Sequence, residues 1–226
     1  MNGDSNHEDL GRTLIYFPVI NNTQMDTANL RESIWQMTLQ KLGKNDRKLK
    51  ANLMDELWFH IERSIHYWPL SYEKVRLYQD GLPVSRKKAK IVTEMAKAGS
   101  LNHRLLLRLM ERGATIMGTE SPELLIQEYE LVKQTLCGSD TLQTAKAVAY
   151  QNALSETLLK RRGQYIADRI NSTLHIGETG ILFLGIAHFL ENWLDKDIRV
   201  IYPINKPFCY GSKGNEKTKS LDSDRR

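Results

Sequence analysis

The sequence lacks a hydrophobic stretch that could cross a membrane. Its longest apolar run, from Ile181 to Leu190, is interrupted by His188 and is well short of the roughly 20 residues that a membrane-spanning helix needs. The first twelve residues include three acidic side chains, whereas a secretory signal has a basic start followed by an apolar stretch. We therefore expect a soluble, cytoplasmic protein without a membrane partner.

Cysteine is scarce, and several familiar motifs are missing. The two cysteines, Cys137 and Cys209, lie far apart, without the spacing of a metal-binding or redox pair, so they fit two reduced thiols. The sequence contains no Gly-x-Gly-x-x-Gly turn, phosphate-binding loop, Gly-x-Ser-x-Gly elbow or Cys-x-x-Cys pair. Binding of NAD or ATP and classical serine hydrolysis therefore lose support.

Length and charge indicate one domain followed by a basic tail. The 226 residues, 41% hydrophobic and 26% charged, are typical of a single globular domain, which we place at residues 1–204. Residues 205–226 hold six basic and three acidic side chains and are expected to be flexible. The basic run from Arg86 to Lys90 has no interleaved aromatic residue, so it favours a solvated helix start, and nucleic acid is not an expected partner.

Short apolar runs alternate with helical patterns along the chain. Helices are predicted between strands, and strands are predicted at residues 14–20, 74–79, 114–117, 180–185 and 198–202. The helical regions comprise two helices within residues 26–68, further helices near 85–98, 100–112, 121–138 and 141–175, and a short helix before the last strand. The helix near 121–138 is expected to begin with Ser121 as N-cap and Pro122 at the first helical position. This order predicts an α/β fold: a mainly parallel sheet of about five strands, helices on both faces and a helical insertion.

Polar side chains follow the predicted strands. In open parallel sheets the binding crevice lies beyond the carboxyl ends of the strands, which selects candidates before any motif is considered. These candidates are Asn21, Asn22, Asp80, Thr119, Glu120 and His188.

His188, Glu120 and Asp80 are the candidates with the most useful chemistry. One imidazole and two carboxylates are suited to a divalent metal such as Mn²⁺ or Zn²⁺, or to general acid–base catalysis. Each also has a structural alternative. His188 could bond a backbone carbonyl, Glu120 could cap the helix that follows it, and Asp80 stands in an Asp-Gly pair typical of turns.

Two segments of the carboxyl half carry a family resemblance. The segment from Arg162 to Ile170 contains an arginine followed by Ile-Ala on a predicted helix, and the segment from Gly180 to His188 is a strand ending in Gly-x-x-His. Together these segments resemble the TraB, ChaN and erythromycin-esterase-like superfamily over about thirty residues. The resemblance implies that Arg162 and His188 are site residues, and Glu120 is the best-placed match to a glutamate that belongs to the pattern.

Two positions depart from the pattern of that superfamily. Asn21 stands where a first Gly-x-x-His histidine is typical, and an asparagine is a poor metal ligand. Gly163 follows the arginine, where Asp or Asn is usual. The superfamily includes metal-dependent peptidases, an esterase-like resistance enzyme and a haem-binding protein, so the resemblance implies a fold more strongly than an activity.

The leading hypothesis is a hydrolase-like protein acting on an ester, amide or phosphoester of a small molecule or peptide. His188 would be base or metal ligand, Glu120 an orienting or ligating carboxylate, Arg162 the group that neutralises an anionic substrate or oxyanion, and Asn21 a polar donor. Asn22, Asp80 and Thr119 would line the substrate site. The alternative is a non-catalytic module that binds a small anionic ligand, a nucleotide or haem, and the sequence is compatible with a homo-oligomer.

Overall fold

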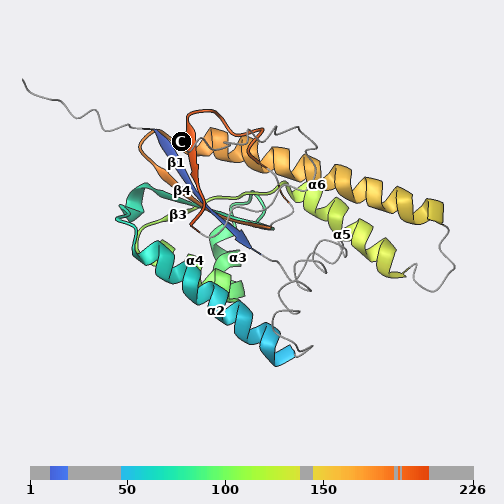
Figure 1. The fold of residues 1–226 in the computed structure, drawn as a ribbon, viewed down its shortest axis with the longest axis horizontal. Coiled ribbons are helices and arrows are strands. Elements are labelled where there is room, and N and C mark those ends of the chain that lie inside the picture. Colours follow the sequence, from blue (N-terminus) through green and yellow to red (C-terminus); the bar gives the residue numbers. More distant parts are fainter. Residues whose placement is uncertain (1–10, 20–46, 138–144, 186–187, 189, 204–226) are drawn as a thin grey trace, which may run out of the picture.

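The computed structural model describes residues 11–19, 47–137, 145–185, 188 and 190–203. Asn21, Asn22, the first predicted helix and the predicted tail at 205–226 lie outside this part of the chain. The described part forms an α/β fold with one parallel sheet and helices on both of its faces (Figure 1).

Five strands form the sheet in the order β3-β2-β4-β1-β5, and every pairing is parallel. Their bounds are β1 (Arg12–Val19), β2 (Val75–Gln79), β3 (Thr115–Ile116), β4 (Thr179–Gly185) and β5 (Ile198–Ile201). The central strand β4 pairs with β2 on one side and β1 on the other. Its apolar residues form an unbroken run because both faces of a parallel sheet are buried.

Alternate residues of β1, β2 and β4 enter two separate cores, as the strand period of two requires. In β1, Ile15 and Phe17 contribute to one core, whereas Leu14 and Tyr16 contribute to the other. The same alternation holds along β4, where Phe183 stacks on Phe17 with ring centroids 5.5 Å apart. The sheet therefore separates two hydrophobic layers.

Helices α2 (Arg47–His66), α3 (Lys88–Lys97) and α4 (Leu101–Glu111) cover the first face. Their inward residues recur at helical spacing and include Ile61, Ile65, Val92, Leu105 and Leu109, all at most 3% exposed. The helices α5 (Pro122–Cys137) and α6 (Ala145–Thr173) follow β3. Helix α6 covers the second face through Ile166, Ala167 and Ile170, and Leu174, just after the helix, packs in the same core. Helix α5 lies beside α6 and extends with it beyond the sheet (Figure 1).

The structure confirms the predicted start of α5 and corrects one other prediction. Ser121 precedes the helix, and its hydroxyl accepts a hydrogen bond from the Leu124 backbone N–H at 3.3 Å, with Pro122 at the first helical position. The short helix expected between β4 and β5 is wrong for residues 190–197, which form turns. Two backbone bonds to the Leu190 carbonyl close only a single turn there. None of the described helices is both long enough and apolar enough to cross a membrane.

Candidate functional site

The connections that follow neighbouring strands of the sheet diverge at the carboxyl ends of β2 and β4. After β2 the chain passes to α3 and α4 on the first face, and after β4 it passes to Leu190 and Trp193 on the second face. Neighbouring parallel strands whose continuations diverge in this way leave an opening where ligands bind. Asp80 follows β2 and His188 follows β4, so both lie at this point of the sheet, where they are buried.

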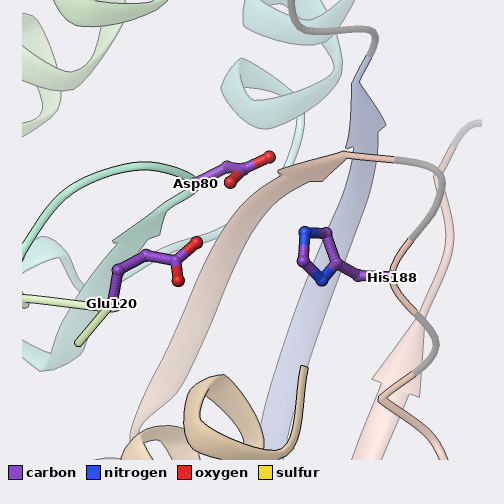
Figure 2. Close-up of side chains that lie close together, drawn as sticks. All are labelled: Asp80, Glu120 and His188. Atoms are coloured by element: carbon purple, nitrogen blue, oxygen red, sulfur yellow. The ribbon is translucent and has the colours of Figure 1, made fainter. Parts of the chain in front are cut away.

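Asp80 is held at the end of β2 by bonds to β4. Its backbone N–H donates to the Phe183 carbonyl at 2.9 Å, and its Oδ2 accepts from the Gly185 backbone N–H at 3.0 Å. Gly81, with a φ of 74°, then turns the chain in a conformation that favours glycine. The Asp-Gly turn is present, but the carboxylate itself is buried close to the side chains of Glu120 and His188 (Figure 2).

Glu120 enters the site through a short parallel bridge with Pro83. The Glu120 carbonyl accepts from the Val84 N–H at 2.8 Å, and the Glu120 N–H donates to the Leu82 carbonyl at 3.0 Å. Gly118 permits this close approach, because a Cβ there would lie 2.5 Å from the Val84 Cα. The bridge leaves the Glu120 side chain fully buried.

Thr119 supports the same segment from inside. Its hydroxyl oxygen accepts a hydrogen bond from the Gln79 backbone N–H at 2.9 Å, and the residue is completely buried. The bond ties the segment before α5 to the end of β2. Thr119 thus helps to fix the separation between Asp80 and Glu120.

The His188 imidazole is buried without a hydrogen-bond partner. The residue is 2% exposed, and neither Nδ1 nor Nε2 bonds to any atom of the described residues. Burial lowers its pKa to about 4; the nearby Asp80 charge opposes this shift and Arg162 adds to it. The ring is therefore neutral at pH 7. Buried polar groups are normally hydrogen-bonded in folded proteins, so this imidazole is an exception that points to a catalytic or ligand-binding role.

Gly163 on α6 makes room beside this imidazole. A Cβ at that position would lie 3.2 Å from the Trp193 ring and 3.8 Å from His188 Nδ1. The glycine therefore lets α6 approach the turn that follows β4. This packing gives a physical reason for a glycine at position 163.

Arg162 of α6 lies among three carboxylates. Its Nε and Nη2 donate to the two oxygens of Glu120 at 3.2 and 2.6 Å, and Nη2 also donates to Asp80 Oδ1 at 3.0 Å. Its Nη1 donates to Glu128 Oε1 at 2.5 Å. The guanidinium is 1% exposed, and its interactions with these carboxylates raise its pKa despite burial. Arg162 is thus a fixed counter-ion of the carboxylates.

The site carries more acidic than basic groups. Burial raises the pKa of Glu120 to about 7; the pairing with Arg162 opposes this shift, and the neighbouring Asp80 adds to it. Burial likewise raises the pKa of Glu128. Glu120 is consequently able to hold or release a proton near neutral pH, beside an imidazole that is uncharged.

The side chains of Asp80, Glu120 and His188 lie close enough together to bind one cation. One ligand atom from each residue lies within 4.8 Å of those from the other two, and Figure 2 shows the three side chains pointing toward a common space. Carboxylate oxygens and a neutral imidazole nitrogen are ligands that Zn²⁺ and Mn²⁺ accept. Neither imidazole nitrogen has a hydrogen-bond partner among the described residues, so one of them can serve as a ligand. The three carboxylates around Arg162 outnumber its single positive charge, which also fits a bound cation.

The structure brings together Asp80, Glu120, Arg162 and His188, and it places Thr119 against them as a support. Asn21 and Asn22 lie outside the described residues. Glu128 was missed by the sequence analysis. It follows the buried Leu124 by four residues on α5, so helical spacing places it on the same inward face, which is an unusual position for a carboxylate.

No protein-family model, curated protein or solved structure matches this chain. The resemblance to the TraB, ChaN and erythromycin-esterase-like superfamily therefore stays a prediction.

Proposed function

We propose that the protein is a hydrolase-like enzyme whose centre is formed by Asp80, Glu120 and His188 and takes up a divalent metal. The observation that carries the proposal is the buried imidazole, which has no hydrogen-bond partner among the described residues and faces two carboxylates within 4.8 Å. The sequence suggested His188 and Glu120 as ligands, and the position of Asp80 favours it as the third. Zn²⁺ or Mn²⁺ suits this donor set.

A bound cation and the side chains of the site would have different roles in hydrolysis. A bound divalent cation would supply Lewis-acid polarisation of the substrate and activation of water. Neutral His188 would offer a nitrogen lone pair to the ion, and Glu120, whose pKa of about 7 allows it to lose its proton near neutrality, would offer a carboxylate oxygen. A cation held in this way fits cleavage of an ester, amide or phosphoester, a reaction in which water must be activated and the substrate polarised.

Arg162 fits a positioning role better than the anion-binding role expected from the sequence. Four hydrogen bonds to Glu120, Asp80 and Glu128 engage its nitrogens, so little donor capacity is left for a substrate. It would hold the two ligating carboxylates apart at the spacing that a cation needs. The resemblance to a superfamily that contains hydrolases adds support for the reaction class.

Metal binding is the first test. The purified full chain is stripped with a chelator, dialysed against Zn²⁺ or Mn²⁺, and analysed for metal content and by titration calorimetry. We expect one ion per chain, lost in His188→Ala and reduced at least about tenfold in affinity in Glu120→Gln. His175→Ala changes an exposed histidine and serves as the matched control. Equal metal content in wild type and His188→Ala would contradict the proposed centre.

Activity is the second test. Generic ester, peptide and phosphodiester substrates are assayed with and without each metal. We expect hydrolysis of at least one class, reduced about 10²-fold or more in His188→Ala, because this variant loses a ligand of the cation that activates water. Turnover that is unchanged in both His188→Ala and Glu120→Gln would reject these catalytic roles.

A non-catalytic ligand-binding module is the second candidate. The observation in its favour is the depth of the centre, since Asp80, Glu120 and His188 are at most 7% exposed in the described structure. A thermal-shift screen with metals, nucleotides and haem separates the two functions. A ligand that raises the melting temperature, in the absence of turnover of any substrate class, would favour the binding module.

A further inference from the structure

A small apolar hollow lies between α2 and α4, and its lining shares no residue with the candidate site. Its volume is about 260 Å³. Ile65, Leu105 and Leu109 contribute buried aliphatic side chains to it, and the rim carries Phe59 and Tyr67, which are 62% and 69% exposed. Exposed aromatic side chains beside an apolar depression are typical of protein interaction sites.

Three arginines also line the hollow. Arg108 is neutralised by Glu62, with Nε–Oε1 and Nη2–Oε2 distances of 2.8 and 2.7 Å. Arg63 and Arg112 instead bond tyrosine hydroxyls, Arg63 that of Tyr67 at 3.1 Å and Arg112 that of Tyr72 at 2.9 Å. In the described part of the chain, neither of these two guanidiniums forms an ion pair with a carboxylate.

The tyrosines hold the two guanidiniums in place without cancelling their charge. The guanidinium carbon of Arg63 is 5.6 Å from the centre of the Tyr67 ring, and that of Arg112 is 5.3 Å from the centre of the Tyr72 ring. An arginine packed in this way keeps N–H groups free for a carboxylate and loses less conformational entropy when it binds one. The hollow is thus an apolar pocket flanked by two ordered, uncompensated positive charges.

We propose that this hollow binds an acidic peptide segment of a partner protein, with one apolar side chain inserted between α2 and α4. The peptide's carboxylates would pair with Arg63 and Arg112. The volume is below the roughly 300–1,000 Å³ of a typical small-molecule site, so it suits one side chain better than a whole cofactor. Arginine and aromatic residues around a pocket are the composition of an interface hot spot.

The charge distribution argues against nucleic acid as the occupant. Affinity for a nucleic acid backbone usually depends on many cationic contacts, whereas this surface offers two uncompensated guanidiniums and also carries Glu62. The aliphatic side chains of the hollow match an apolar side chain better than a phosphate. An RNA therefore serves as the competing arm of the test.

Fluorescence anisotropy with the full chain tests this proposal. The probe is a fluorescein-labelled peptide of sequence Glu-Glu-Leu-Phe-Glu-Glu, compared with one in which serine replaces both apolar residues and one in which lysine replaces every glutamate. We expect a dissociation constant below about 1 mM for the first peptide only, and weaker binding as salt increases. Absence of binding up to that concentration would overturn the proposal.

Variants assign the binding to the hollow. We expect the Arg63→Gln/Arg112→Gln double variant to weaken binding about tenfold or more, and Phe59→Ser to weaken it severalfold. All three side chains are exposed, so the fold should persist, and circular dichroism checks this. Arg86→Gln removes an exposed arginine elsewhere and should leave binding unchanged. An equal loss in Arg86→Gln, or tighter binding of a labelled single-stranded RNA than of the acidic peptide, would overturn the proposal.

Discussion

Arg162 and Glu120, 42 residues apart in the chain, form a two-pronged ion pair that is almost completely buried. The pair joins α6 to the segment before α5, and the same guanidinium extends to Asp80 at the end of β2. A buried charge of this kind is costly when its partner is removed, because the remaining ion is neither solvated nor paired. The pair is therefore the most sensitive point at which to perturb the site.

Loss of the guanidinium should destabilise the fold strongly. We expect Arg162→Leu to lower the free energy of unfolding by about 3–5 kcal/mol, because it leaves Asp80 and Glu120 buried without their counter-ion. Urea denaturation measures the change. Arg108→Leu removes an arginine from a half-exposed ion pair and should cost about 1 kcal/mol or less. A similar loss in the two variants would contradict the counter-ion role of Arg162.

The proton on Glu120 should make stability depend on pH around neutrality. Its pKa is raised to about 7 in the folded chain, so the folded state holds this proton more tightly than the unfolded state. The resulting stabilisation is complete below the unfolded pKa and is lost as the pH rises through about 7. The melting temperature of wild type minus that of Glu120→Gln should therefore fall as the pH is raised from about 5 to about 8, across the pKa of about 7. A difference that stays constant would show that Glu120 is already ionised.

The buried His188 imidazole should make the stability of the fold depend on pH on the acidic side of neutrality. Its pKa is depressed to about 4, so the folded chain favours the neutral ring. That contribution is complete above the unfolded pKa and is lost as the pH falls through about 4. Relative to His188→Gln, wild type should lose stability on acidification, and NMR of the imidazole should show a neutral ring above about pH 5. A charged ring at pH 6, about two units above the depressed pKa, would contradict burial as the cause.

The approach of the Glu120 segment to the Leu82–Val84 backbone should not tolerate a side chain at Gly118. We expect Gly118→Ala to destabilise the fold by about 1–3 kcal/mol and to weaken metal binding, because the new methyl group would push Glu120 away from Asp80. Thermal unfolding and titration calorimetry measure the two effects. Gly11→Ala is the control, since its Cβ would lie at an ordinary 3.7 Å from the nearest atom. Unchanged metal affinity in folded Gly118→Ala would contradict the link to the site.

Glu128 should matter less than Glu120 although both bind Arg162. Its side chain is 31% exposed, so water screens the interaction and can solvate Arg162 after the change. We expect Glu128→Gln to lower the free energy of unfolding by about 1 kcal/mol and Glu120→Ala to lower it more, because alanine removes both buried oxygens that accept from Arg162. Denaturation of both variants under identical conditions provides the comparison.

Local sequence signals predicted the elements of the fold well where burial and capping follow simple rules. The continuous apolar runs of β1 and β4 identified strands buried on both faces, and Ser121-Pro122 marked the start of α5. The short helix before β5 was wrong because its apolar residues, among them Leu190 and Trp193, pack on the second face from a turn. Apolar content there reflected tertiary burial and not helical periodicity.

The sequence by itself determined that polar groups would gather at the carboxyl ends of parallel strands, because strand–helix alternation fixes that edge of the sheet. Only the tertiary structure decided that Arg162 pairs with Asp80, Glu120 and Glu128, and that the imidazole of His188 lacks a partner among the described residues. The physical reason is distance along the chain. Hydrogen bonds and desolvation depend on separations of a few ångströms between segments that strand order and helix packing bring together, and no local pattern records these separations.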